Sequence, residues 1–246
     1  MRNFKLVLSY DGSDFQGWQT QPGYRTVQET LESALAKLTG ETKVRVNASG
    51  RTDAGVHALG QVANFHSTLT IPDARLLGAI NAHLPDDLVA LSVEEAPPSF
   101  HANRDALRKR YRYVIHDGLV HSPFMRRYAC HSRLPLDAAA MARAAAPLRG
   151  THDFHSFETD WPNRASSVRT ITYLAVNRAG AYLWIDVEAD GFLYNMVRAI
   201  AGTLMNVGRG FWPESKVAEI LSATDRTEAG PTAPAQGLFL VRVTYA

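Results

Sequence analysis

The sequence predicts an α+β protein made of two halves, each with the element order βαββαβ and a mainly antiparallel sheet. Two observations predict this class. Strand-like alternation and helix-like periodicity follow one another in the same order twice, and turn residues separate the segments. The chain has 246 residues, 46% of them hydrophobic, and is long enough to bury a large core. We therefore predict an N-terminal half over residues 1–103 and a C-terminal half over residues 104–246.

The N-terminal half begins with FKLVLSY (4–10), which alternates like a strand and ends at a turn of Asp11 and Gly12. Thr26 and Glu29 have the spacing of a capping box, which satisfies free backbone N–H groups where a helix begins. That helix ends at Gly40. Its apolar stripe is Val27, Leu31, Ala34, Leu35 and Leu38. The remaining elements of this half are strands around 43–48 and 61–67, a helix from 72 to 84, and a strand around 88–96.

The C-terminal half repeats this order. KRYRYVIH (109–116) alternates like a strand, and the alanine-rich segment 137–147 is predicted to be a helix. The segments 167–178 and 182–190 form a hairpin across Ala179 and Gly180. The last elements are a helix that begins near Leu193, an additional helix over 213–223, and a closing strand over 237–245. Both halves are therefore predicted to be ferredoxin-like, and a central cleft between two such sheets is a natural ligand site.

Charge and composition narrow the possible partners. Between Arg104 and Arg133 there are eight Lys or Arg and two Asp, a local balance of +6 in a chain of net charge +2. Such a basic stripe fits either a polyanion, whose counterions it displaces, or an ordinary solvated surface. The single cysteine, Cys130, excludes an intrachain disulfide and a CxxC metal site and favours the reducing cytosol. Without a run of eighteen apolar residues, we expect a soluble cytoplasmic protein with no membrane span.

The stretch SGRTDAGVHALG (49–60) is the first candidate site. It sets Arg51, Asp53 and His57 among the glycines Gly50 and Gly55, in a loop between two predicted strands. Glycines allow a sharp bend and a close approach to a ligand, and Arg51 favours an ionised Asp53. An aspartate that bonds its own backbone in an Asx turn would also explain Asp53. A structural turn, however, has no need of Arg51 and His57.

A second set of candidates lies in the C-terminal half. Arg198 interrupts an apolar helix and, if buried, needs an anionic partner; Glu188 or Asp190 nearby and Asp53 farther away are the alternatives. Tyr111 and Tyr113 share one face of their strand, where aromatic rings either stack on unpaired bases or fill the core. We assign Tyr113 and Ile115 to the core, whereas Tyr111 is near enough to the strand start to reach the cleft.

The sequence gives little support for a metal site, a nucleotide-binding loop or a serine hydrolase. His152 and His155 have helix-like spacing but no third ligand, and no Walker loop, dinucleotide fingerprint or hydrolase elbow is present. By elimination, the chemistry rests on one aspartate and needs no cofactor. Two rival functions remain: an RNA-binding protein without catalysis, and a metal-dependent nuclease, which would need clustered carboxylates. The acidic pairs Asp86 and Asp87, and Glu94 and Glu95, look more like solvated surface.

Several longer stretches resemble the tRNA pseudouridine synthase A family across nearly the whole chain. They are YDGSDFQGWQTQP (10–22), TVQETLESAL (26–35), SGRTDAGVHALGQVANF (49–65), FHANRDALRKRYRYVI (100–115), GFLYNMVRAIAGTLMNVGRG (191–210) and AGPTAPAQGLFLVRVTY (229–245). The resemblance implies the pseudouridine synthase fold and isomerisation of uridines 38, 39 and 40 in the anticodon stem-loop of tRNA. It also implies a homodimer and no metal or cofactor requirement.

The same resemblance implies residue roles. The catalytic aspartate falls on Asp53, the active-site tyrosine on Tyr111, the aspartate-pairing arginine on Arg198, and the arginine of the catalytic motif on Arg51. The predicted substrate-binding residues are Tyr111, Arg51, His57, Lys109 and Arg110. Asn103 stands where an arginine or lysine is expected, which puts one RNA contact in doubt but not the chemistry.

Overall fold

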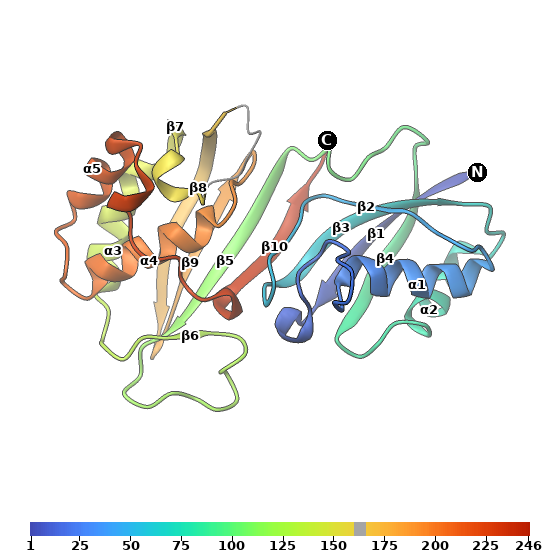
Figure 1. Ribbon diagram of the computed structural model, residues 1–246, viewed down its shortest axis with the longest axis horizontal. Coiled ribbons are helices and arrows are strands. Elements are labelled where there is room, and N and C mark those ends of the chain that lie inside the picture. Colours follow the sequence, from blue (N-terminus) through green and yellow to red (C-terminus); the bar gives the residue numbers. More distant parts are fainter. Residues whose placement is uncertain (160–165) are drawn as a thin grey trace. The chain divides into compact units, whose positions relative to one another are not determined.

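The computed structural model describes residues 1–159 and 166–246 and confirms the α+β class (Figure 1). The chain divides into two compact units. Unit 1 contains Met1–Leu107 together with Phe239–Ala246, and unit 2 contains Arg108–Leu238. This division lies close to the predicted boundary after residue 103 but differs at the C-terminus, because the last eight residues return to unit 1.

Within unit 1 the strand order is β4-β1-β3-β10, with a short β2 also paired to β3. Its strands are β1 (Arg2–Tyr10), β2 (Val46–Ala48), β3 (His57–Ser67), β4 (Leu88–Ala96) and β10 (Leu238–Thr244). β1 runs antiparallel to β3 and β4, whereas β10 runs parallel to β3. Alternate residues of β1, from Phe4 to Tyr10, are buried, so one face of this sheet builds the core as the alternation predicted.

Two helices complete unit 1, α1 (Val27–Thr39) and α2 (Asp73–Asn81), and they contact each other. α1 begins and ends where the sequence predicted. The Thr26 side chain accepts a hydrogen bond from the Glu29 N–H, and Gly40 caps the C-terminus with φ of 72°. The order βαββαβ of the N-terminal half is confirmed.

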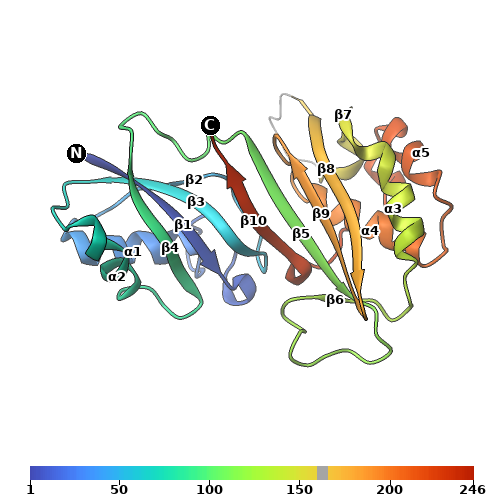
Figure 2. The same cartoon turned by 180° about the vertical axis from the view of Figure 1, so that it is seen from behind.

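Unit 2 has a sheet in the order β5-β9-β8-β7, with β6 paired to β5. Its strands are β5 (Arg108–His116), β6 (Cys130–His131), β7 (Gly150–Asp153), β8 (Val168–Ala179) and β9 (Tyr182–Ala189). Its helices are α3 (Ala138–Ala145), α4 (Met196–Gly208) and α5 (Lys216–Ala223), which lie together beside the sheet in both views (Figures 1 and 2). The hairpin between β8 and β9 turns at Gly180, as predicted.

Short 3-10 helices connect these elements, at Gly12–Asp14, Ala146–Leu148, His155–Phe157, Arg226–Glu228 and Ala235–Gly237. Within the described residues, every helix is too short or too polar to cross a bilayer.

The closing strand predicted over 237–245 is confirmed as β10 (Leu238–Thr244), and it extends the sheet of unit 1. β10 pairs with β3 at His57 and Ala58, and the ring of Phe239 stacks on that of His57 at 4.7 Å. At the far end of β10 the Tyr245 hydroxyl donates a hydrogen bond to the Ala102 carbonyl. These contacts hold the end of the chain beside the loop that carries Asp53.

A partly buried ion pair joins three parts of unit 2. Asp117, which follows β5, accepts hydrogen bonds from both terminal nitrogens of Arg178 in β8, at 3.0 and 2.6 Å. It also accepts a bond from the backbone N–H of Leu136, just before α3. Burial raises the pKa of Asp117, but the bonds from Arg178 and Leu136 outweigh this effect, so the pKa lies below its ordinary value.

We expect Arg178→Met to reduce the free energy of unfolding by about 2 kcal/mol at pH 7, because it leaves the buried Asp117 carboxylate without its cation. Since the folded state lowers the pKa of Asp117, the contribution is present above the unfolded value near 4 and is lost as the pH falls through the folded value. Urea denaturation at pH 7 and at pH 3 measures this. The control is Arg143→Met, which removes an exposed pair with Glu214 and should change stability little. Equal losses in the two variants would contradict the expectation.

Candidate active site

The loop that carries Asp53 lies between β2 and β3 in unit 1. β3 begins at His57, four residues earlier than the predicted strand, so the loop proper is residues 49–56. Asp53 is partly exposed, and Gly55 has φ of 77°. The N–H of Val56 donates to the main-chain carbonyl of Asp53, and the N–H of Gly55 donates to the Phe15 carbonyl. Both N–H groups thus bond main-chain carbonyls, which fixes the turn around Asp53.

Residues 10–18, which we call the clamp segment, hold one side of this loop. The Tyr10 hydroxyl and the Thr52 Oγ1 are 2.9 Å apart, and the Trp18 N–H donates to the Thr52 carbonyl at 2.9 Å. Burial raises the pKa of Tyr10 to about 12, so its phenol stays protonated beneath the loop at neutral pH. Sequence reasoning missed the clamp segment as part of the site, although YDGSDFQGW contains the two glycines that make it possible.

Polar side chains hold the start of the loop. The buried Ser49 hydroxyl donates to Gln61 Oε1 at 2.6 Å, and Gln61 Nε2 donates to the Gly50 carbonyl at 2.9 Å. The Asn103 amide donates to the Ser49 carbonyl. Asn103 therefore supports the loop that carries Asp53, which is a role the sequence did not suggest for it.

His57 and Arg51 differ in their surroundings. His57 is only 1% exposed, and its Nδ1 accepts a hydrogen bond from the Gly12 N–H at 3.0 Å. Because Nδ1 accepts here, the neutral ring carries its proton on Nε2, and the nearby Asp11 carboxylate forms an ion pair with it only if the ring is protonated. These contacts favour a supporting role for His57, and its predicted contact with RNA stays a prediction. Arg51, by contrast, is exposed to solvent.

We expect Gly12→Ala to reduce activity more than tenfold, because a Cβ at residue 12 would lie 2.0 Å from the Val56 carbonyl oxygen and force the loop to move. The matched control is Gly78→Ala in α2, where a Cβ meets nothing within 4 Å and should be neutral or stabilise the helix. Activity measurements together with circular dichroism separate loop displacement from unfolding. Full activity in a folded Gly12→Ala protein would show that the loop tolerates displacement.

Arg198 lies in the first turn of α4 in unit 2, after Asn195, whose φ is 62°. Its Nε donates to the Ala233 carbonyl at 2.7 Å, and its Nη1 donates to Asn195 Oδ1 at 2.8 Å. Both acceptors are neutral, so these two bonds fix the position of the guanidinium without cancelling its charge.

Tyr111 lies in β5 and is 8% exposed, and its ring is nearly perpendicular to that of Phe192, with a centroid distance of 4.9 Å. Tyr113 and Ile115 are fully buried, which confirms their assignment to the core. The Tyr113 hydroxyl donates to the Pro234 carbonyl at 2.8 Å. Among these three residues, Tyr111 is the one that keeps some access to solvent.

Two arginines of the basic stripe, Arg110 and Arg112, form ion pairs within the sheet of unit 2. The buried Asp186 in β9 accepts two hydrogen bonds from Arg112, both at 2.9 Å, and lies 3.2 Å from Nη2 of Arg110. Arg110 also stacks over the ring of Tyr173. Burial lowers the pKa of Lys109. Sequence reasoning missed Asp186, because it lies more than seventy residues from its partners and only strand pairing brings it to them.

No three His, Cys, Asp or Glu side chains lie close enough to hold a metal ion, as far as the structure describes the chain. His152 instead contacts the Arg149 carbonyl, and His155 contacts the Glu158 carboxylate.

Comparisons with known proteins converge on one family. A family profile described as tRNA pseudouridine synthase matches residues 6–103 and 144–246. The chain is 46% identical over 245 residues to tRNA pseudouridine synthase A of Thermoanaerobacter sp. strain X514, and 47% identical over 245 residues to that of Brevibacillus brevis, with both chains covered in full. A relative of the same name in Moorella thermoacetica is 48% identical over 243 residues, which are 98% of each chain.

Proposed function

The chain belongs to the tRNA pseudouridine synthase family and is an isomerase that forms pseudouridine in tRNA, and we propose that it acts on uridines 38, 39 and 40 of the anticodon stem-loop through Asp53. One observation supports this assignment above the others. Asp53 lies in a loop held from both sides by the clamp segment and by Ser49, Gln61 and Asn103. Reactive groups are commonly carried by loops on a rigid scaffold.

The reaction requires that the base be detached and held. The N1–C1′ glycosidic bond breaks, the uracil turns, and a C5–C1′ bond forms in its place. A uridine in a stem or loop must first leave its stack, which costs a few kcal/mol. Water must be excluded meanwhile, because hydrolysis of the intermediate would leave an abasic site.

The Asp53 carboxylate has two possible roles. As a nucleophile, it forms a bond to C1′ while the N1–C1′ electron pair leaves with uracil, and attack by C5 then expels it. As a base, it takes the C2′ proton while N1 leaves, which gives a glycal, and the proton returns to C2′ when the C5–C1′ bond forms. In both routes the proton on C5 is lost at the end.

The other predicted residues take roles that suit their chemistry. We assign to Arg198 the charge that keeps Asp53 ionised, and to the exposed Arg51 a contact to the backbone of the flipped nucleotide. Tyr111 stacks on uracil or takes the C5 proton. Lys109 and Arg110 contact the stem, although Asp186 already neutralises part of the charge of Arg110. His57 supports the loop from its buried position, and a contact of its ring with the RNA stays a prediction.

Tritium release tests the function. We expect the protein to release tritium from tRNA labelled at C5 of uridine, with excess chelator present, and mapping of the product should place pseudouridine at positions 38, 39 and 40. Binding of tRNA without release would favour a pure RNA-binding protein. RNA cleavage that the chelator stops would favour a metal-dependent nuclease.

We also propose that the protein works as a homodimer in the cytoplasm. The basic area of one chain is modest for a tRNA, because Asp186 offsets the charges of Arg110 and Arg112. A stem that contacts two protomers would double that area. Light scattering coupled to size-exclusion chromatography measures the mass, and a monomer under assay conditions would contradict this proposal.

A further inference from the structure

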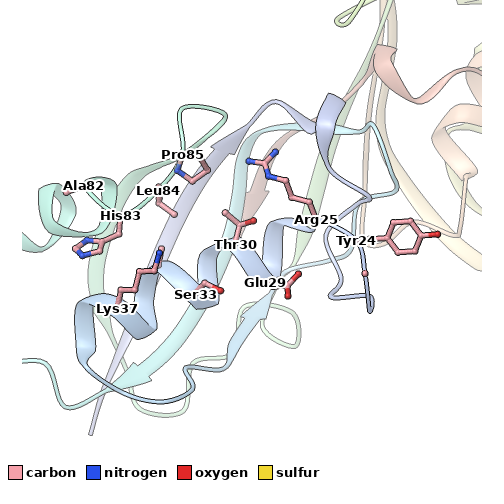
Figure 3. A pocket seen from close by; sticks show the side chains of 12 residues that line it. Tyr24, Arg25, Glu29, Thr30, Ser33, Lys37, Ala82, His83, Leu84 and Pro85 are labelled. Atoms are coloured by element: carbon pink, nitrogen blue, oxygen red, sulfur yellow. The ribbon is translucent and has the colours of Figure 1, made fainter.

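A polar groove of about 770 Å³ lies on unit 1, between α1 and residues 82–85, which follow α2 (Figure 3). Its helix wall consists of Thr30, Ser33, Ala34 and Lys37, which share one side of α1 because they are spaced three and four residues apart. Small side chains and hydroxyls therefore line the middle of the groove. None of the roles assigned above uses this surface.

Basic side chains lie at both ends of the groove. Figure 3 shows Lys37 and His83 near one end and Arg25 and Tyr24 toward the other. His83 is held in place by a bond from Nδ1 to the Ala79 carbonyl at 2.9 Å. Glu29 is the acidic side chain among the lining residues, and it is exposed. The Lys37 ammonium and the hydroxyls of Thr30 and Ser33 suit the phosphate oxygens of a ligand that lies along α1.

Arg25 fixes the two walls relative to each other. Its two terminal nitrogens bond the two carboxylate oxygens of Asp87, both at 2.7 Å, and its guanidinium lies 4.0 Å from the centroid of the Phe15 ring. The hydrogen bonds to Asp87 raise the pKa of Arg25. The groove is thus held open by a two-bond ion pair.

The same residues lead to the loop that carries Asp53. The Arg25 carbonyl accepts a hydrogen bond from the Gln16 N–H at 2.9 Å, and the Phe15 carbonyl accepts one from the Gly55 N–H at 3.3 Å. The clamp segment therefore contacts the groove through Arg25 and the loop through Phe15. The clamp segment thus lies between a ligand in the groove and that loop.

We propose that this groove binds the sugar–phosphate backbone of the tRNA substrate, as a docking site additional to the loop that carries Asp53; the inference rests on the proposed function. Small residues let a nucleic-acid backbone come close to α1, Thr30 and Ser33 donate to phosphate oxygens, and Lys37 attracts them, while Arg25, already paired with Asp87, holds the walls in place. From Glu29 to Lys37 the helix rises about 12 Å, which spans about three nucleotides of a helical strand.

Fluorescence anisotropy with an unmodified tRNA transcript, at several salt concentrations, tests the groove. We expect Lys37→Glu to weaken binding about tenfold and to lower the salt slope by about one. Glu29→Gln should strengthen binding, because it removes a negative charge from the groove. The matched control is Lys43→Glu, an exposed lysine of unit 1 outside the groove, which should change the affinity much less.

Binding and activity are measured separately, so the groove proposal and the proposed function can fail independently. Pseudouridine formation at saturating tRNA is measured in parallel, and Lys43→Glu should leave it unchanged. If Lys37→Glu and Lys43→Glu weaken binding equally, or if Glu29→Gln has no effect, the groove is not a docking site even when the enzyme is active. If the wild type binds tRNA and the variants differ as expected but no pseudouridine forms, the groove proposal stands and the proposed function fails.

Discussion

Replacing Asp53 by asparagine should abolish pseudouridine formation while leaving tRNA binding and the fold in place. Asparagine has nearly the same shape, but it can neither attack C1′ nor accept the C2′ proton. The N–H groups of Gly55 and Val56 bond main-chain carbonyls, so these bonds of the turn do not depend on the carboxylate. Loss of a nucleophile or base lowers the rate by about 10²- to 10⁴-fold, so we expect at least this loss in tritium release.

The matched control for this variant is Asp86→Asn, which alters an exposed aspartate of the same unit. It should leave tritium release unchanged. Binding of tRNA by anisotropy and thermal unfolding show whether each variant is folded and engages its substrate. Normal tritium release by Asp53→Asn would contradict the proposed mechanism, and Asp53 would then be only a structural residue of the loop.

Local signals in the sequence were sufficient to predict most helices and turns. The capping box at Thr26, the left-handed Gly40 and the hairpin at Gly180 depend on residues only a few positions apart, and all three are confirmed. The place of the closing strand beside β3 could not be predicted. Alternation indicates which face of a strand is buried but not which sheet edge it joins, so the pairing of β10 with β3 was missed. β6 and β7 have only two and four residues, which is too short for periodicity.

The candidate site was likewise predicted only in part. Charged residues among glycines identified the loop that carries Asp53, but several of the bonds that hold it join main-chain atoms, such as the Trp18 N–H and the Thr52 carbonyl. Main-chain bonds do not depend on the residue type, so the sequence does not indicate them. Gly12 makes a contact that does depend on residue type, since any side chain there would collide with the Val56 carbonyl. The sequence presents it only as an ordinary turn glycine.

Replacing Arg198 by methionine should lower kcat by about 10²- to 10³-fold, the usual effect of losing one fixed charge at a reacting centre. The bonds from Arg198 to Ala233 and Asn195 will also be lost, so some loss of thermal stability is expected whatever the role of the charge. A rate measurement alone therefore cannot distinguish catalysis from structure. The pH dependence of kcat can, because a nearby cation favours the ionised form of a carboxyl group. If Arg198 keeps Asp53 ionised, the acidic limb of the profile should move to higher pH in Arg198→Met.

Two further variants complete this test. Arg198→Lys keeps the charge but has no second nitrogen to bond both Ala233 and Asn195, so it should restore the acidic limb while recovering only part of kcat. Arg209→Met, at the other end of α4, removes an arginine from the same helix and should leave the profile unchanged. A lower melting temperature in Arg198→Met with an unmoved acidic limb would assign Arg198 to the structure of unit 2 alone. A shift that the lysine variant reverses would instead establish that the charge itself acts on the reacting carboxylate.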